Sequence, residues 1–135
     1  MDTSFIIAFF NAEDDFHDDA KTIIGNTLAK DPLIKFYFTD YIFDEIVTLL
    51  KIRKIPKESI EAIGEALLHS NLWKLIKISK LDFQNTWKMA KKYNDKEWSF
   101  TDVNSFIIME AYKILVFLSY DAHFSEYPKI KKWVI

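Results

Sequence analysis

Two acidic residues in the last third of the chain have positions that suit chemistry. Asp102 is the third residue of a predicted helix (103–113 in its regular part) that Ser99 opens, in a capping-box pattern. Asp121 follows an apolar, β-branched run (114–120) of the length expected for a buried parallel strand. Ligands of open α/β sheets gather outside the carboxyl ends of the strands. A helix of about three turns and a returning strand span the interval between the two aspartates, so their carboxylates could meet.

Two further acids lie far upstream. Asp2 precedes an apolar run (5–10) whose periodicity cannot separate strand from helix. Glu45 falls in a predicted helix that begins at residue 39 or 40 and ends near 53, on or beside an apolar stripe, whereas Asp44 is expected to face solvent. A carboxylate on such a stripe costs free energy unless it is paired or binds a metal. The alternative for Glu45 is a helix-edge residue paired with a lysine or arginine.

Predicted strands alternate with predicted helices along the chain. The strand candidates are 33–38, 72–78 and 114–119, with a possible edge strand at the C-terminal end. The remaining helix candidates are 16–30, 58–70 and 82–93, and Trp87 is expected to face inward in the last of them. This alternation indicates a parallel α/β sandwich.

Composition narrows the class of protein. A chain of 135 residues predicts one domain (1–135), and 50% hydrophobic content predicts a sizeable core. Two glycines and three prolines disfavour a turn-rich all-β fold, and the absence of cysteine excludes disulfides and thiolate chemistry. We expect a soluble, cytoplasmic protein, because no leader or long apolar span is visible. A net charge of −2 argues mildly against a nucleic-acid partner unless an acid cluster binds cations.

Four motifs, in order and at compatible spacings, resemble the PIN-domain nucleases of the VapC toxin type. They are Asp2-Thr3-Ser4 with the later NAEDDFH (11–17), TDYIFDEIVTLL (39–50), SFTD (99–102) and SYDAHF (119–124). Each motif alone is weak, but together they cover essentially the whole chain. In the family several apolar residues forming a first strand precede the first aspartate, whereas only Met1 does so here. We therefore expect a very short or truncated first strand, followed by a helical segment at 5–10.

The resemblance implies a fold, a reaction and partners. The fold would be a three-layer α/β/α sandwich with a central parallel sheet of four to five strands. The activity would be that of a Mg²⁺- or Mn²⁺-dependent endoribonuclease, the toxin of a type II pair. The expected partners are RNA, a small antitoxin and a second copy of the chain, without a membrane. Hard divalent cations prefer the carboxylate oxygens that such a site supplies.

The same resemblance assigns roles to individual residues. Asp2, Asp102 and Asp121 would be the main metal ligands, and Glu45 would orient or deprotonate the attacking water, or bind the metal through water. Polar support would come from Thr3, Ser99 and Asn104. For Asn104 the alternative is an exposed helix residue, and for Asp102 it is a purely structural cap.

Two other functions stay open at this point. One is a PIN-like binding module without activity, which the presence of all four acids disfavours. The other is a DNA-directed nuclease, because the fold resembles structure-specific DNA nucleases. The histidines show no metal-ligand spacing, and the lysines of the helix at 82–93 suit a solvated face more than a nucleic-acid patch.

Overall fold

The computed structural model describes residues 1–129 and 132–134. Its α-helices are α1 (Thr3–Phe10), α2 (His17–Lys30), α3 (Asp40–Ile52), α4 (Lys57–His69), α5 (Lys80–Lys92) and α6 (Phe100–Ala111), with a 3-10 helix, η1, at Ala122–Glu126. Its strands are β1 (Phe36–Thr39), β2 (Trp73–Ile76), β3 (Val116–Leu118) and β4 (Lys132–Val134). Helices and parallel strands alternate, which confirms the predicted α/β class.

The strands form two parallel pairs. β1 pairs with β2, from Phe36 opposite Trp73 to Thr39 opposite Ile76, and β3 pairs with β4 over three residues. Between the pairs lie the first two residues of the chain. The amine of Met1 donates to the carbonyl of Tyr37 in β1 at 2.9 Å, and the N–H of Asp2 donates to the carbonyl of Leu118 in β3 at 3.2 Å.

A very short first strand was predicted at Asp2, but the structure has no strand there. Asp2 is the N-cap of α1, and its side chain accepts from the N–H of Phe5. Only one residue precedes Asp2, and one residue cannot build a ladder with its neighbours. The ambiguous apolar run at 5–10 belongs to α1, as the resemblance implied.

The other predicted elements are present with shifted ends. The α5 helix begins earlier than expected, because Ser79 forms a complete capping box with Asp82. The α6 helix begins where the capping box of Ser99 and Asp102 predicted, and it ends at Ala111, earlier than expected. The strands are shorter than predicted, and Leu33 lies in an exposed turn instead of a strand. Trp87 was predicted to face inward, but the structure places it on the exposed side of α5.

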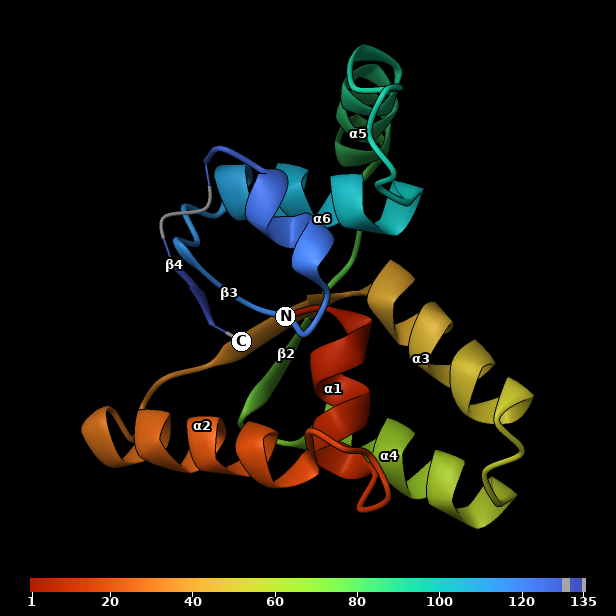
Figure 1. The fold of residues 1–135 in the computed structure, drawn as a ribbon, viewed down its shortest axis with the longest axis vertical. Coiled ribbons are helices and arrows are strands. Elements are labelled where there is room, and N and C mark those ends of the chain that lie inside the picture. The colour runs from red at the N-terminus through yellow and green to blue at the C-terminus, as the bar shows by residue number, and fades with distance from the viewer. Residues whose placement is uncertain (130–131, 135) are drawn as a thin grey trace.

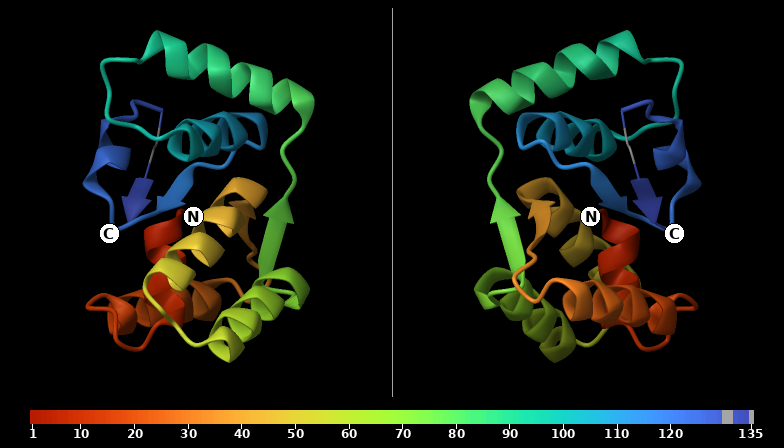
Figure 2. Two further views of the ribbon diagram at one scale, coloured as in Figure 1. Left: turned by 90° about the vertical axis from the view of Figure 1, so that its right-hand side faces the viewer. Right: turned by 90° about the vertical axis from the view of Figure 1, so that its left-hand side faces the viewer.

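Two apolar clusters hold the elements together. The larger surrounds α1, whose Phe5 and Ile6 are fully buried, and includes residues of β1 and α3. The smaller joins α6 to β3 and η1, with the rings of Phe106 and Tyr127 stacked at a centroid distance of 4.1 Å. Figures 1 and 2 show α5 and α6 at one end of the molecule and α1 to α4 at the other, with the strands between them. Among the described residues, none of the helices combines the length and apolar character needed to cross a bilayer.

Candidate active site

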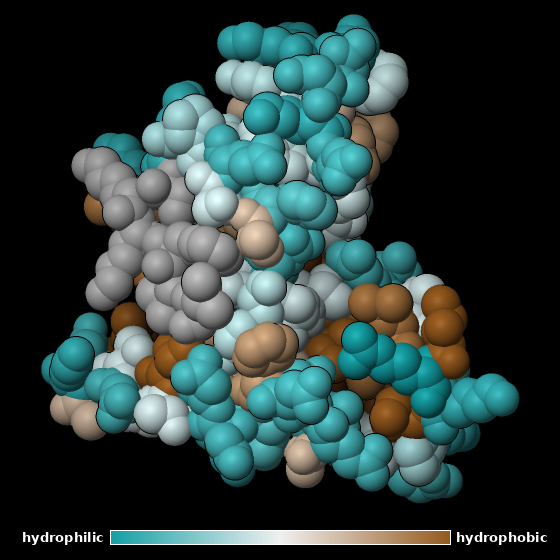
Figure 3. Space-filling model, in the orientation of Figure 1, coloured by the Kyte–Doolittle hydropathy of each residue, from teal (hydrophilic) through white to brown (hydrophobic). Residues whose placement is uncertain are grey.

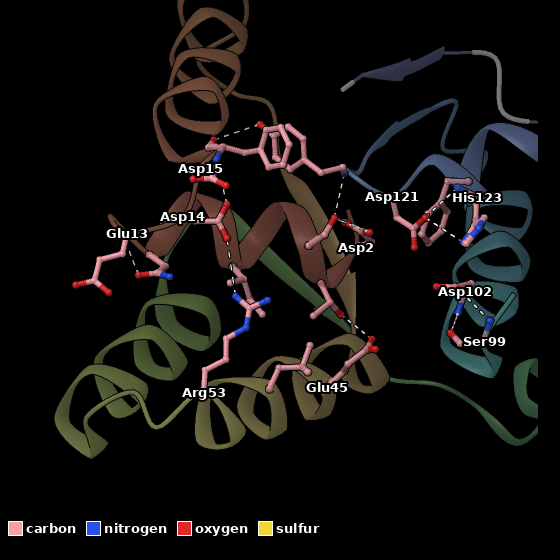
Figure 4. Close-up of a pocket in the computed structure, with 18 of the residues that line it drawn as sticks. Asp2, Glu13, Asp14, Asp15, Glu45, Arg53, Ser99, Asp102, Asp121 and His123 are labelled. Atoms are coloured by element: carbon pink, nitrogen blue, oxygen red, sulfur yellow. Dashed lines mark hydrogen bonds and ion pairs between the residues drawn. The ribbon is translucent and has the colours of Figure 1, made fainter. Parts of the chain in front are cut away.

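A cleft of about 700 Å³ opens where these two ends meet. Its lining includes the four predicted acids (Figure 4). Asp2 and Asp121 are the N-caps of α1 and η1, whereas Glu45 and Asp102 lie within α3 and α6. Figure 4 shows Asp2 between Glu45 on one side and Asp102 with Asp121 on the other. Four acids separated by up to 119 positions in the sequence thus line one cavity.

Asp2 is the most buried of the four, with 5% of its surface exposed. Its Oδ2 accepts a hydrogen bond of 2.6 Å from Ser119 Oγ, and its Oδ1 accepts from the N–H of Phe5 at 3.1 Å. Ser4 Oγ donates to the carboxylate as well, at 3.0 Å. These bonds fix the carboxylate between α1 and the end of β3.

Glu45 occupies the middle of α3 and is partly buried, whereas Asp44 is exposed, as predicted. Thr3 Oγ1 donates to Glu45 Oε2 at 2.7 Å. The alternative expected for Glu45, pairing with a lysine or arginine, does not occur among the described residues. The hydroxyl of Thr3 therefore orients a carboxylate that lies beside an apolar stripe.

The other two acids sit at helix starts. Asp102 accepts from the N–H of Ser99 at 2.8 Å, and Ser99 Oγ accepts from the N–H of Asp102 at 3.1 Å. Asp121 accepts from the N–H of His123 at 2.9 Å, and the Nδ1 atom of His123 lies 3.3 Å from the same oxygen. Both carboxylates are thus held by backbone groups of the helix they begin, and the structural and functional interpretations of Asp102 are compatible.

Two of the four acids in the cleft have raised pKa values. Burial raises the pKa of Asp2 to about 6, against the hydrogen bonds from Ser119 and Phe5 and the nearby charge of the Met1 amine. Burial also raises the pKa of Asp102, and the charges of Glu45 and Asp121 raise it further. A bound cation would relieve this repulsion, because it favours the ionised form of every carboxylate around it.

The donor set fits a hard divalent cation, since it consists of carboxylate oxygens and hydroxyls. Within residues 1–129 and 132–134, however, no three acidic or histidine side chains converge closely enough to enclose a metal ion by themselves. Mg²⁺ keeps several waters when it binds, so it does not require an all-protein cage. The residues that could hold it are Asp2, Asp102 and Asp121, with Glu45 opposite them.

Of the three polar residues predicted to support the site, two line the cleft and one does not. Thr3 and Ser99 line the cleft and hydrogen bond to Glu45 and Asp102. Asn104 does not line it, because two positions of helix turn a side chain about 200° away from Asp102. Asn104 is fully buried, so the exposed alternative is wrong too, and its Nδ2 donates to Thr86 Oγ1 in α5 at 3.0 Å.

Sequence reasoning missed residues that complete the cleft. Ser4 and Ser119 hold Asp2 and also accept from the N–H groups of Tyr120 and Asp121, so they connect α1 to the end of β3. The Nη1 atom of Arg53, at the end of α3, lies 3.9 Å from the Oδ2 atom of Asp14. A serine two residues before the strand-terminal aspartate was visible in the SYDAHF motif, but no local pattern shows its distant partner.

The sequence and the fold of this chain are both similar to those of known proteins. The sequence profile of the PIN domain matches residues 1–130. A VapC ribonuclease of Archaeoglobus fulgidus is 27% identical over 126 residues, which cover 93% of this chain and 78% of that protein. The crystal structure of Mycobacterium tuberculosis VapC20, described as a sarcin-ricin loop cleaving toxin, superimposes with a TM-score of 0.82 at 25% identity, over 96% of this chain and 95% of that one. The chain therefore belongs to the PIN domain family.

Proposed function

We propose that this chain is an endoribonuclease that hydrolyses RNA phosphodiester bonds with Mg²⁺ or Mn²⁺, and that it acts in the cytoplasm as the toxin of a type II toxin–antitoxin pair. The observation that carries the proposal is that four carboxylates line one cleft. Its support also comes from the similarity to a VapC ribonuclease and to a toxin that cleaves the sarcin-ricin loop.

Each carboxylate has a distinct proposed role. Asp2, Asp102 and Asp121 are the ligands of the cation, which when bound polarises the phosphodiester and neutralises developing negative charge. Glu45 takes the proton of the attacking water. Thr3 donates to Glu45 Oε2, so Oε1 is the oxygen that accepts this proton.

The charge of the cleft supports a need for a cation. Its lining contains many more acidic than basic side chains: Asp2, Glu13, Asp14, Asp15, Glu45, Glu97, Asp102 and Asp121 against Arg53 and His123. An RNA phosphate entering this cleft meets net repulsion, and a divalent cation bound among the acids lowers that repulsion and gives the phosphate a positive centre to bind. The same chain without metal is expected to bind RNA weakly.

Protein partners are also part of the proposal. An apolar groove between α3 and α4, lined by Phe43, Val47, Ile60 and Leu68 among others, gives a small antitoxin a surface for an apolar segment. Figure 3 shows apolar side chains gathered where these helices lie. For the proposed homodimer, exposed Phe83 and Trp87 on α5 supply apolar surface. Light scattering at high micromolar concentration should give twice the mass of one chain, and a clean monomer mass would contradict the homodimer.

The fold supplies a matched pair of variants for testing the catalytic role. Asp82 forms the same capping box with Ser79 at the start of α5 as Asp102 forms with Ser99, but it lies outside the cleft. Asp102→Asn and Asp82→Asn therefore change a helix cap in the same way. Each asparagine keeps an oxygen for the cap, so stability should change by at most about 1 kcal/mol.

The experiment compares labelled RNA and DNA of one sequence, with Mg²⁺ and with EDTA. Wild type and Asp82→Asn should cleave RNA only with Mg²⁺, and Asp102→Asn should lose at least about a hundredfold in rate. Undiminished cleavage by a folded Asp102→Asn variant would defeat the proposed site. Equal cleavage of DNA would indicate a DNA-directed nuclease, and no cleavage by any folded variant would indicate a binding module.

A further inference from the structure

Three aromatic rings form a continuous stack at the rim of the cleft. Phe5 is fully buried and stacks on Tyr120 at a centroid distance of 5.4 Å and an interplanar angle of 10°. Tyr120 stacks in turn on Phe16 at 4.3 Å and 14°. Phe16 is 47% exposed, although one face of its ring is covered by Tyr120. The stack therefore ends in a flat aromatic face that is open to solvent.

This stack is attached rigidly to the catalytic acids. Tyr120 lies between Ser119 and Asp121 in the chain, and its N–H donates to Ser4 Oγ at 3.0 Å. Its hydroxyl donates to Asp19 at 2.8 Å, which fixes the ring from the other end. Phe16 and Tyr120 both line the cleft. A group stacked on Phe16 would consequently have a fixed position relative to Asp121.

The segment before Phe16 is also held in place. The Oδ1 atom of Asp14 accepts from the N–H of Phe16 at 3.1 Å, and the Oδ1 atom of Asn11 accepts from the N–H of Glu13 at 3.3 Å. Asp15 is exposed, lines the cleft and precedes Phe16 directly. Figure 4 shows Asp14 and Asp15 at the rim, on the α2 side of Asp2.

These surroundings select the chemistry of a ligand. A phosphate beside Asp14, Asp15 and Asp19 would be repelled, whereas an uncharged ring would not. Unpaired bases of RNA bind proteins by stacking on aromatic side chains, and a base is flat and uncharged. We propose that an unpaired base of the RNA substrate stacks on the outer face of Phe16, next to the phosphodiester that is cleaved. This inference rests on the proposed ribonuclease function.

Asp15 makes the proposal more specific. An ionised carboxylate only accepts hydrogen bonds, through two oxygens side by side. Guanine is the base whose Watson–Crick edge presents two adjacent donors, N1–H and the N2 amino group, so it matches both oxygens. Uracil and adenine each present an acceptor to the same group. The site is therefore assigned to guanine, with Phe16 holding the face of the base and Asp15 reading its edge.

The test begins with Phe16→Leu, which keeps apolar bulk but removes the flat face. Tyr112→Leu is the control, because Tyr112 is an exposed aromatic residue at the end of α6 and lies outside both the cleft and the proposed protein interfaces. With a guanine-containing RNA, Phe16→Leu should raise KM roughly ten- to a hundredfold and leave kcat within about threefold. Tyr112→Leu should change neither. An unchanged KM for a folded Phe16→Leu variant overturns the site.

A binding measurement separates this failure from failure of the proposed function. In Phe16→Trp the new indole keeps the stack and reports on it, and guanosine-containing trinucleotides should quench its fluorescence more than adenosine- or uridine-containing ones. Asp15→Asn should remove that preference, since its amide replaces one acceptor with donors. Quenching without RNA cleavage would retain the base site and reject the ribonuclease. Cleavage without base-dependent quenching, or a preference that survives Asp15→Asn, would reject the assigned guanine site alone.

Discussion

Asp2→Asn should stabilise the metal-free protein while it removes metal binding. Burial raises the pKa of Asp2 from 3.8 to about 6, so at neutral pH the folded state holds a carboxylate that would prefer to be protonated. Two pKa units at 1.36 kcal/mol each give a cost of about 3 kcal/mol. Asparagine removes this cost but weakens the hydrogen bonds from Ser4 and Ser119, which leaves a gain of about 2 kcal/mol. For a domain of this size that corresponds to a rise in Tm of roughly 5–10 °C.

The pH dependence has a definite sign. Between pH 4 and pH 6 the folded state of the wild type binds more protons at Asp2 than the unfolded state does, so stability falls as pH rises through this window. The advantage of Asp2→Asn should therefore be absent near pH 4 and complete above about pH 7. At pH 8 the Met1 amine, whose pKa burial lowers to about 6, is uncharged, so the variant loses no ion pair there.

Thermal unfolding at pH 4.5 and pH 8, with and without Mg²⁺, measures both effects. Mg²⁺ should raise the Tm of the wild type at pH 8 and leave that of Asp2→Asn unchanged. Asp18→Asn, on the exposed side of α2, is the control and should behave as wild type. A variant that is less stable than wild type at pH 8, or equally more stable at both pH values, would refute the reasoning from buried charge.

Two further predictions concern the same cleft. Glu45→Gln should lower kcat by about a hundredfold or more and change Mg²⁺ affinity by less than about threefold. Thr3→Val should lower kcat by a smaller factor, because it only removes the hydrogen bond that orients Glu45. Single-turnover kinetics and calorimetric metal titration measure the two effects, and a loss confined to metal affinity would make Glu45 a ligand instead. Lowering the pH from 7 to 5 should weaken Mg²⁺ binding at least about tenfold, because Asp2 is mostly protonated below its pKa of about 6. Calorimetry at both pH values measures the affinity, and a pH-independent affinity would exclude Asp2 as a ligand.

The alternation of elements and the sharing of one cleft by four acids could be predicted from the sequence. The alternation and the approach of Asp121 to Asp102 follow from local rules: apolar runs form strands, capping boxes begin helices, and parallel strands end at one edge. Asp102 illustrates this, because the SFTD pattern fixed the start of α6 and hence the place of the carboxylate. The place of Asp2 and Glu45 in the same cleft was expected only from the resemblance to PIN-domain nucleases. Thr3 was expected only to give polar support, and its hydrogen bond to Glu45 was not predicted, because the two residues lie 42 positions apart in the sequence.

Other features depend on tertiary contacts that no local pattern contains. Trp87 was expected inside because large aromatic residues are usually buried, but α5 packs mainly on α6 and leaves that side open. Asn104 was expected to give polar support to the site, yet the helical repeat turns it toward Thr86. The stack of Phe16 on Tyr120 joins residues 104 positions apart, and neither residue stands out locally.

The position of Met1 and Asp2 between the two strand pairs has a consequence for motion. Glu45 belongs to the half of the molecule built on β1 and β2, whereas Asp102 and Asp121 belong to the half built on β3 and β4. Two backbone hydrogen bonds at the start of the chain, to Tyr37 and Leu118, lie on the boundary between these halves. A cation bound to Asp2, Asp102 and Asp121 would join the boundary residue Asp2 to the half that carries the other two acids, so amide hydrogen exchange at the start of the chain and in that half should slow together when metal binds.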